Sequence, residues 1–168
     1  MSEKIWHVLV LCTGNSARSI MAESLLNAMG QGRLRAYSAG SHPAGQVHAL
    51  AIQQLQAMGL PTDGLRSKSW DEFAGADAPQ MDCVITVCDN AAGEMCPFWP
   101  GQPIGAHWGF ADPAAATGTE EEKRQAFERV FQQIQSRVRL LVDLPLKTLE
   151  PSALKQALAA IGQTGVVV

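Results

Sequence analysis

The sequence has few aromatic residues, few charges and no long apolar run. Aromatic residues make up 6% of the 168 positions, with a single tyrosine, and charged residues make up 17%. The net charge of −3 offers no broad attraction for nucleic acid or an anionic membrane, so we expect neither as a partner. No stretch approaches the roughly 20 apolar residues that a membrane-spanning helix needs. Any anion site must therefore be local.

Cysteine is scarce as well. There are four cysteines, Cys12, Cys83, Cys88 and Cys96. They are too few and too clustered for a disulfide scaffold, and neither a CxxC motif nor a second ligand pair with zinc spacing accompanies them. The N-terminus mixes acids and bases and runs directly into an apolar stretch, unlike a signal peptide. We therefore expect a cytoplasmic protein, in which cysteines stay mostly reduced, and we predict no cofactor and no metal.

Apolar strand patterns alternate with helical patterns along the chain. Strands are predicted at 5–11, 33–40, 81–87 and 104–108, and helices at 19–29, 46–58, 68–76, 120–141 and 152–161. This alternation is typical of an α/β fold with a parallel, doubly wound sheet. We assign residues 1–144 to one domain and residues 145–168 to a C-terminal helical extension and tail.

The stretch CTGNSARS joins the first predicted strand to the first predicted helix. Ligands of open α/β sheets bind beyond the carboxyl ends of strands, and the unpaired N–H groups of a helix start favour a tetrahedral oxyanion. Gly14 and Asn15 are best able to adopt a positive φ and curl the loop, while Arg18 offers a planar fork of donors. The predicted oxyanion site comprises Thr13, Gly14, Asn15, Ser16, Ala17, Arg18 and Ser19.

The same surroundings favour a reactive thiolate at Cys12. A free thiol titrates near 8.5, whereas helix N-termini and neighbouring cations lower that pKa to roughly 3.5–7.5. The Ser19 hydroxyl can add a hydrogen bond to the sulfur. We therefore predict that Cys12 is a nucleophile facing the bound oxyanion. The alternative is that Cys12 is a small buried residue and Arg18 a surface charge.

The segment VLVLCTGNSARSIMAE resembles the first strand and catalytic loop of the low-molecular-weight protein tyrosine phosphatase fold, and more closely the arsenate reductases built on it. The similarity covers about residues 5–140 and implies a four-stranded parallel sheet flanked by helices. Some members bind potassium through an asparagine, an acid and a serine, for which Asn15, Glu23 and Ser38 are candidate counterparts. Because RSKSWDEF supplies no clear further acidic ligand, we predict no metal here.

A second segment, TVCDNAAGEMCPFWPG, helps to distinguish a reductase from a phosphatase. It is similar to the redox segment of the arsenate reductases, in which two cysteines serve in relay; here these are Cys88 and Cys96. A phosphatase needs one thiol for its covalent intermediate, whereas reduction of arsenate takes two electrons, which a dithiol supplies. Two buried structural thiols are the alternative. Cys83, inside an apolar strand, is interpreted as a core residue.

A third segment, HWGFADPAAA, contains Asp112 followed by Pro113. This pair resembles the general acid of the fold, which protonates the departing oxygen. A loop or capping aspartate is the alternative interpretation. Tyrosine phosphatases of this fold usually carry tyrosines just after the Asp-Pro pair, but alanines follow here and the single tyrosine is Tyr37. That absence counts against an aryl phosphate substrate.

Taken with the resemblance, these segments predict an arsenate reductase. Catalysis would involve Cys12, Arg18, Cys88, Cys96 and Asp112. The resemblance implies thioredoxin as the reductant of three-cysteine members, with glutaredoxin and glutathione as the alternative. Two other functions remain open: phosphomonoester hydrolysis through a phosphocysteine intermediate, and a non-enzymatic oxyanion sensor or adaptor.

Overall fold

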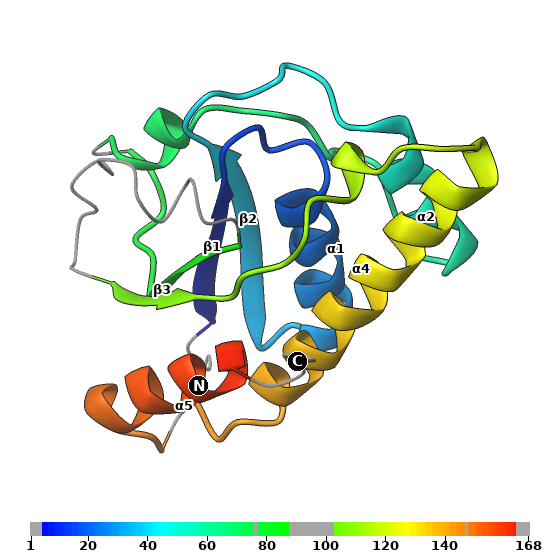
Figure 1. Cartoon of the computed structure of the whole chain (residues 1–168). Helices are drawn as coiled ribbons and strands as arrows, with labels where there is room; N and C mark the ends of the chain where they lie inside the picture. Colours follow the sequence, from blue (N-terminus) through cyan, green and yellow to red (C-terminus); the bar gives the residue numbers. More distant parts are fainter. Residues whose placement is uncertain (1–4, 76, 88–102, 147, 164–168) are drawn as a thin grey trace.

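The protein folds around a four-stranded sheet in which neighbouring strands are parallel and follow the order β2-β1-β3-β4 (Figure 1). The structure, a computed structural model, describes residues 5–75, 77–87, 103–146 and 148–163. The strands are β1 (Trp6–Cys12), β2 (Leu34–Gly40), β3 (Cys83–Thr86) and β4 (Ile104–His107). The parallel α/β sheet that the sequence predicts is confirmed.

Helices connect and cover the strands. They are α1 (Arg18–Gly30), α2 (Ala49–Ala57), α4 (Glu120–Val142) and α5 (Pro151–Gln163), with 3₁₀ turns η1 (Trp70–Phe73) and η2 (Pro113–Ala115). Each of the predicted helices overlaps one of these elements. The long helix α4 begins with a capping box, in which Thr119 and Glu122 satisfy each other's backbone N–H groups.

Two predicted helices are shorter in the structure than in the sequence pattern. Helix α2 begins at Ala49 instead of residue 46, because the His48 ring accepts a hydrogen bond from the Leu50 N–H at 3.1 Å and caps the helix there. The predicted helix 68–76 is the single 3₁₀ turn η1, capped by Ser69. The turn η2 was not predicted.

Strand β1 lies inside the sheet and is covered on both faces. Val8 and Val10 pack in the larger core with the helices, whereas Leu9 and Leu11 pack in a smaller core on the other face with Phe73. Successive residues of a strand point to opposite faces, so a strand covered on both sides is apolar without interruption. This explains the continuous apolar run that marks β1 in the sequence.

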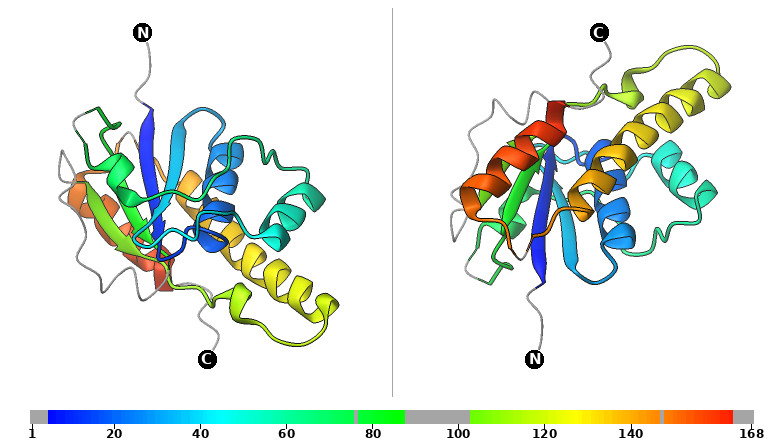
Figure 2. Two further views of the ribbon diagram at one scale, coloured as in Figure 1. Left: turned by 90° about the horizontal axis from the view of Figure 1, so that it is seen from above. Right: turned by 90° about the horizontal axis from the view of Figure 1, so that it is seen from below.

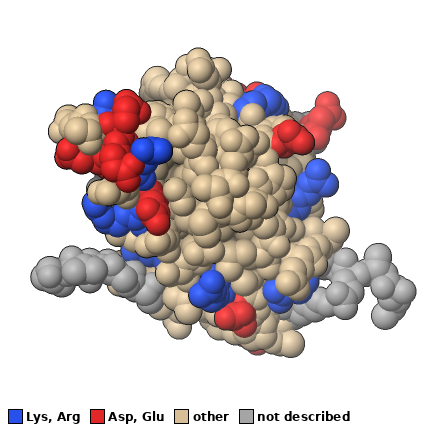
Figure 3. Space-filling view, turned by 90° about the vertical axis from the view of Figure 1, so that its right-hand side faces the viewer, with Lys and Arg blue, Asp and Glu red and all other residues tan. Residues whose placement is uncertain are grey.

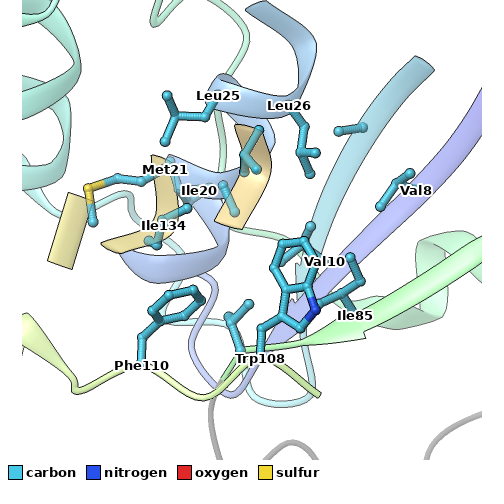
Figure 4. Close-up of a cluster of buried hydrophobic side chains, with 14 of the residues drawn as sticks. Val8, Val10, Ile20, Met21, Leu25, Leu26, Ile85, Trp108, Phe110 and Ile134 are labelled. Atoms are coloured by element: carbon cyan, nitrogen blue, oxygen red, sulfur yellow. The ribbon is translucent and has the colours of Figure 1, made fainter. Parts of the chain in front are cut away.

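Helices α1 and α4 pack side by side on one face of the sheet, and α5 lies against β4 (Figures 1 and 2). Figure 4 shows Ile20 of α1 near Ile134 of α4, and Trp108 lying beside Val10. The larger core therefore lies between the sheet and this helical layer.

The C-terminal helix α5 is packed on the rest of the chain. Leu154, Leu158 and Ile161 are buried in the larger core, and the Trp108 indole N–H donates to the Leu158 carbonyl oxygen at 2.9 Å. Whether residues 145–168 form a separate unit stays a prediction.

Charges of both signs are scattered over the face shown in Figure 3, around a broad area of uncharged residues. This face carries no continuous basic surface, so attraction of an anion there depends on local groups. Within the described ranges, no helix is both long and apolar enough to cross a membrane.

Candidate active site

The predicted oxyanion loop lies at the carboxyl end of β1, where neighbouring strands also end. Cys12 pairs with Gly40 at the end of β2, and the Val87 N–H, just after β3, donates to the Leu11 carbonyl at 2.9 Å. The chain that leaves β4 returns toward the same edge, since the Phe110 N–H donates to the Val87 carbonyl at 3.3 Å. Segments far apart in sequence thus meet at one edge of the sheet, as parallel strands require.

Carbonyl groups of the loop point outward. Three backbone N–H groups after β2 donate to them at 2.9 Å: His42 to Thr13, Ala44 to Gly14 and His48 to Ser16. The C=O and N–H of a trans peptide group point in opposite directions, so the N–H groups of Gly14, Asn15 and Ala17 face the inside of the loop. Inward N–H groups at a helix start can bind a tetrahedral oxyanion.

The backbone turns at Asn15, whose φ of 48° lies in the left-handed region. The predicted positive φ is therefore found at Asn15 and not at Gly14. Asparagine tolerates this region because its short amide can bond locally, and here the side chain is fully buried.

Gly40, at the end of β2, lies very close to the loop: a Cβ there would collide with the Thr13 carbonyl oxygen and lie 3.1 Å from the Asn15 nitrogen. The end of β2 thus approaches the loop closely because it lacks a side chain.

The Cys12 side chain is buried and its sulfur contacts two polar groups of the loop and the start of α1. The Ser19 hydroxyl lies 2.9 Å from the sulfur, and the Asn15 N–H donates to it at 3.2 Å. The predicted contact between Ser19 and the sulfur is present.

Arg18 joins the loop to the segment that follows β4. Its Nη1 donates to the Phe110 carbonyl oxygen at 3.1 Å, and its Nη2 lies 3.8 Å from Asp112 Oδ2. The Arg18 side chain is 15% exposed and that of Asp112 is 45% exposed, so this ion pair is partly open to water and weak. The structure thus brings the predicted anion-binding guanidinium and the predicted general acid together.

Asp112 has a different partner at each oxygen. Its Oδ1 accepts the Ala114 N–H at 3.0 Å and caps η2, while Oδ2 faces Arg18. Its backbone is extended, with φ −81° and ψ 108°, as a residue before proline should be. The interpretation as a capping residue is therefore correct for one oxygen, and the other lies on the side of the loop arginine.

Of the four cysteines, Cys12 and Cys83 lie among the described residues. Cys83 is buried in the larger core, as predicted, and burial, with a smaller contribution from Asp82, raises the pKa of its thiol to about 12. Cys88 and Cys96 lie outside the described residues, so their part in a relay stays a prediction.

Residues of the segment before η1 also hold the loop, and sequence reasoning missed them. The Ser67 hydroxyl donates to the Gly14 carbonyl at 3.1 Å, and the Lys68 N–H donates to Asn15 Oδ1 at 2.9 Å. Nothing local in RSKS signals these contacts, because the partners are distant in sequence.

Arg137 of α4 was missed as well. Its Nη1 donates to the Gly109 carbonyl at 2.9 Å and its guanidinium lies 4.4 Å from the centre of the Phe110 ring. It therefore supports the segment that leads to Asp112. The sequence did contain a signal for a buried role of Arg137, because this arginine interrupts the apolar face of α4 three residues after the buried Ile134.

The residues offered for potassium do not form a suitable set of ligands. Asn15, Glu23 and Ser38 lie together, but the Lys68 ammonium is 3.6 Å from the Glu23 carboxylate, and the Asn15 carbonyl oxygen accepts the Lys68 N–H. A hard cation needs several free oxygen ligands. Across the part of the chain that the structure describes, no group of three or more His, Cys, Asp or Glu could hold a metal ion.

Residues 7–156 match the family described as low molecular weight phosphotyrosine protein phosphatase. The chain therefore belongs to this family. Its curated relatives include an arsenate reductase of Halalkalibacterium halodurans, 36% identical over 143 residues that cover 85% of this chain and 98% of the relative. An arsenate reductase of Bacillus subtilis is 37% identical over 139 residues, covering 83% and 95%.

Solved structures give the same picture. A structure of an arsenate reductase in the phosphate binding state superposes with a TM-score of 0.67 at 29% identity, covering 82% of this chain and 97% of that one. The resemblance to arsenate reductases of this fold is confirmed.

Proposed function

We propose that this protein is an arsenate reductase that converts arsenate to arsenite through a Cys12 thiolate adduct and a disulfide relay. The observation that carries the proposal is the loop at the end of β1, where inward N–H groups, the Cys12 sulfur and Arg18 converge. The curated relatives named arsenate reductase support the choice of oxyanion.

Binding of arsenate would use the whole loop. Arsenate is a tetrahedral oxyanion, which suits several N–H donors arranged around one centre and a bidentate guanidinium. The binding residues would be Thr13, Gly14, Asn15, Ser16, Ala17, Arg18 and Ser19. Arg18 would have to exchange part of its contact with Phe110 or Asp112 for the substrate.

The first chemical step forms a sulfur–arsenic bond. The Cys12 thiolate attacks arsenic, and one arsenate oxygen leaves as water after Asp112 supplies a proton. Asp112 suits this role because one of its oxygens faces Arg18 and the side chain is 45% exposed, so a proton can be replaced from solvent.

The next steps move electrons and disulfides. The Cys88 thiolate attacks the Cys12 sulfur, the sulfur–arsenic bond breaks, and its electron pair reduces arsenic to the trivalent state, which leaves as arsenite. A Cys12–Cys88 disulfide results. Cys96 then attacks Cys88, so the disulfide becomes Cys88–Cys96 and the Cys12 thiolate is restored.

An external dithiol must then reduce the Cys88–Cys96 disulfide. The resemblance to three-cysteine reductases favours thioredoxin, and glutaredoxin with glutathione is the alternative. The enzyme would act in the cytoplasm, where such reductants are available, and would serve arsenic detoxification and resistance.

Hydrolysis of phosphomonoesters is the second candidate, because the family description is that of a phosphatase. Against an aryl substrate, Ala114 and Ala115 follow Pro113 where an aromatic wall would be needed. Tyr37 lies in β2, stacked on His7 with its hydroxyl 3.0 Å from the His7 ring.

The deciding experiment measures arsenate-dependent NADPH oxidation in the presence of thioredoxin and thioredoxin reductase. We expect steady turnover for the wild type and for Cys83→Val, the matched control in the core. Cys88→Ser should permit at most one round of chemistry, and Cys96→Ser should block turnover with thioredoxin.

Two results would contradict the proposal. Turnover of an aryl phosphate that survives Cys88→Ser and Cys96→Ser, with no arsenate-dependent NADPH oxidation, would identify a phosphatase. Tight oxyanion binding without turnover under thioredoxin or glutaredoxin would identify a sensor or adaptor.

A further inference from the structure

Arg137 of α4 is an arginine buried in the protein interior. It is 6% exposed, and burial lowers the pKa of its guanidinium. Removing a charged group from water costs free energy unless hydrogen bonds or other charges compensate for it. The contacts that Arg137 makes must therefore offset this cost.

Arg137 contacts two neighbouring residues of the segment that follows β4. Its Nη1 donates to the Gly109 carbonyl oxygen at 2.9 Å, and its guanidinium carbon lies 4.4 Å from the centre of the Phe110 ring. A planar guanidinium can donate a hydrogen bond and stack on a ring at the same time. Figure 4 shows Phe110 near Ile134 of α4, three residues before Arg137. Arg137 therefore holds the backbone at Gly109 and the side chain at Phe110.

The backbone of Phe110 contacts the arginine of the oxyanion loop. The Phe110 carbonyl oxygen accepts a hydrogen bond from Arg18 Nη1 at 3.1 Å, and the Phe110 N–H donates to the Val87 carbonyl oxygen at 3.3 Å. Residues 108–112 belong to no helix or strand, so the direction of the Phe110 carbonyl depends on contacts such as these. Phe110 thus joins two arginines, because its ring contacts Arg137 and its carbonyl oxygen contacts Arg18.

We propose that Arg137 is a positioning residue that places the Arg18 guanidinium for oxyanion binding. By holding Gly109 and Phe110, it keeps the Phe110 carbonyl directed at Arg18 Nη1. The remaining N–H groups of Arg18 are then placed for the anion in advance, since a guanidinium has five donors. A group that is preorganised in this way loses less freedom on binding, which raises the affinity. The inference deepens the proposed function and rests on it for the role of Arg18 in binding the substrate.

Two simpler roles of Arg137 make different predictions. If Arg137 mattered only for stability, any destabilising core substitution would weaken anion binding equally. If Arg137 attracted the anion by its charge alone, any cation at position 137 would preserve the affinity. The proposed role instead couples Arg137 to Arg18, so the loss of Arg137 should matter only while the Arg18 guanidinium is present.

The test measures the Kd of inorganic phosphate by isothermal titration calorimetry. Arg137→Met removes both contacts and keeps a long side chain, whereas Arg137→Lys keeps the charge but lacks the planar fork. Arg139→Met is the matched control, because position 139 is exposed on the same helix. Leu141→Ala controls for a loss of stability, since Leu141 is buried beside Trp6 and Cys83 at the starts of β1 and β3.

Each substitution is made in the wild type and in Arg18→Lys. In the wild type we expect Arg137→Met to raise the Kd about tenfold and Arg137→Lys about threefold, as for coupled residues of one network. Arg139→Met and Leu141→Ala should leave the Kd unchanged. In Arg18→Lys, which lacks the fork that contacts Phe110 and the anion together, Arg137→Met should change the Kd by less than about twofold.

Four results would overturn the inference. An unchanged Kd for Arg137→Met would mean that Arg18 is placed without help from Arg137. An equal rise in the wild type and in Arg18→Lys, or an equally large rise for Leu141→Ala, would indicate a merely structural role. A wild-type Kd for Arg137→Lys would mean that charge alone sets the affinity.

Arg137→Lys also covers a failure of Arg137→Met to fold, which circular dichroism detects. Lysine keeps a charged head on a long apolar stem, so this variant should fold, and its rise in Kd should vanish in Arg18→Lys. The same rise in both backgrounds would again overturn the inference. Because phosphate binding needs no redox chemistry, absence of arsenate-dependent NADPH oxidation would contradict the proposed function and leave the result for Arg137 standing.

Discussion

Hydrogen bonds and ion pairs with residues that are distant in the sequence orient several side chains of the candidate site. Asp112 caps η2 with one oxygen and faces Arg18 with the other, and Arg18 in turn holds the Phe110 carbonyl. The cap lies within HWGFADPAAA and could be anticipated there, whereas the two contacts with Arg18 are not visible in that segment. The types of residue at the site could be predicted from the loop motif, but the bonds that orient them depend on how β4 returns to β1.

Arg18→Lys should weaken oxyanion binding. Lysine carries the same charge but lacks the planar fork that can contact two anion oxygens and Phe110 at once. We expect the Kd for phosphate, measured by isothermal titration calorimetry, to rise about tenfold to a hundredfold, or about 1.4–2.7 kcal/mol. Arg124→Lys, at an exposed position of α4, should leave the Kd unchanged. Equal affinities for Arg18→Lys and the wild type would exclude the guanidinium from the site.

Cys83 should make stability depend on pH in alkaline solution. The folded thiol has a pKa of about 12, above its ordinary value of 9.0, so the folded state keeps a proton that the unfolded chain releases. The contribution is full below about pH 9 and is lost toward pH 12, by at most about 1.4 kcal/mol per pH unit.

Urea unfolding at about pH 8 and about pH 10 measures this effect. The free energy of unfolding should fall by about 1 kcal/mol more for the wild type than for Cys83→Val, which has no titrating group. Parallel decreases in the two proteins would show that Cys83 titrates normally in the fold.

Among the elements, β2 approaches the oxyanion loop so closely at Gly40 that a Cβ there would collide with the loop backbone. The strands and helices themselves were predictable, because each has an apolar pattern of its own period and clear end signals. The starting residues of α2 and η1 could not be predicted, because His48 and Ser69 act as caps only in their folded surroundings. The candidate site likewise lies where elements end, between β1 and α1.

Gly40→Ala should damage the loop without removing any catalytic group. The new methyl would collide with the Thr13 carbonyl and crowd Asn15, so the loop must move. We expect a loss of about 1–3 kcal/mol in the free energy of unfolding and a weaker affinity for phosphate. The control is Gly105→Ala in β4, where a Cβ meets nothing within 4 Å. If Gly40→Ala binds phosphate as the wild type does, the close approach is unimportant.

For the whole molecule, α5 completes the larger core at the β4 side. Leu158 is buried, and its carbonyl oxygen accepts a hydrogen bond from the Trp108 indole N–H. Trp108 lies two residues before Phe110, and the Phe110 carbonyl oxygen accepts a hydrogen bond from Arg18. The helix therefore contacts the start of the segment that carries Asp112.

Leu158→Ala should lower the free energy of unfolding by about 2–5 kcal/mol, because it leaves a cavity in the larger core beside Val8 and Leu154. Denaturant unfolding followed by tryptophan fluorescence measures the change. Leu140→Ala, at a position of α4 that is 42% exposed, should change stability by less than about 0.5 kcal/mol. A small effect at Leu158 would mean that α5 contributes little to the core.

From the sequence alone, the parallel sheet and the loop CTGNSARS could be predicted, because they depend on short-range patterns, whereas the nucleophilic role of Cys12 stays a prediction. The burial of Lys68, the contact of Asp112 with Arg18 and the support from Arg137 emerged only in the folded protein. A polar side chain becomes buried and directed when distant segments close over it, and no local pattern encodes which segments those are.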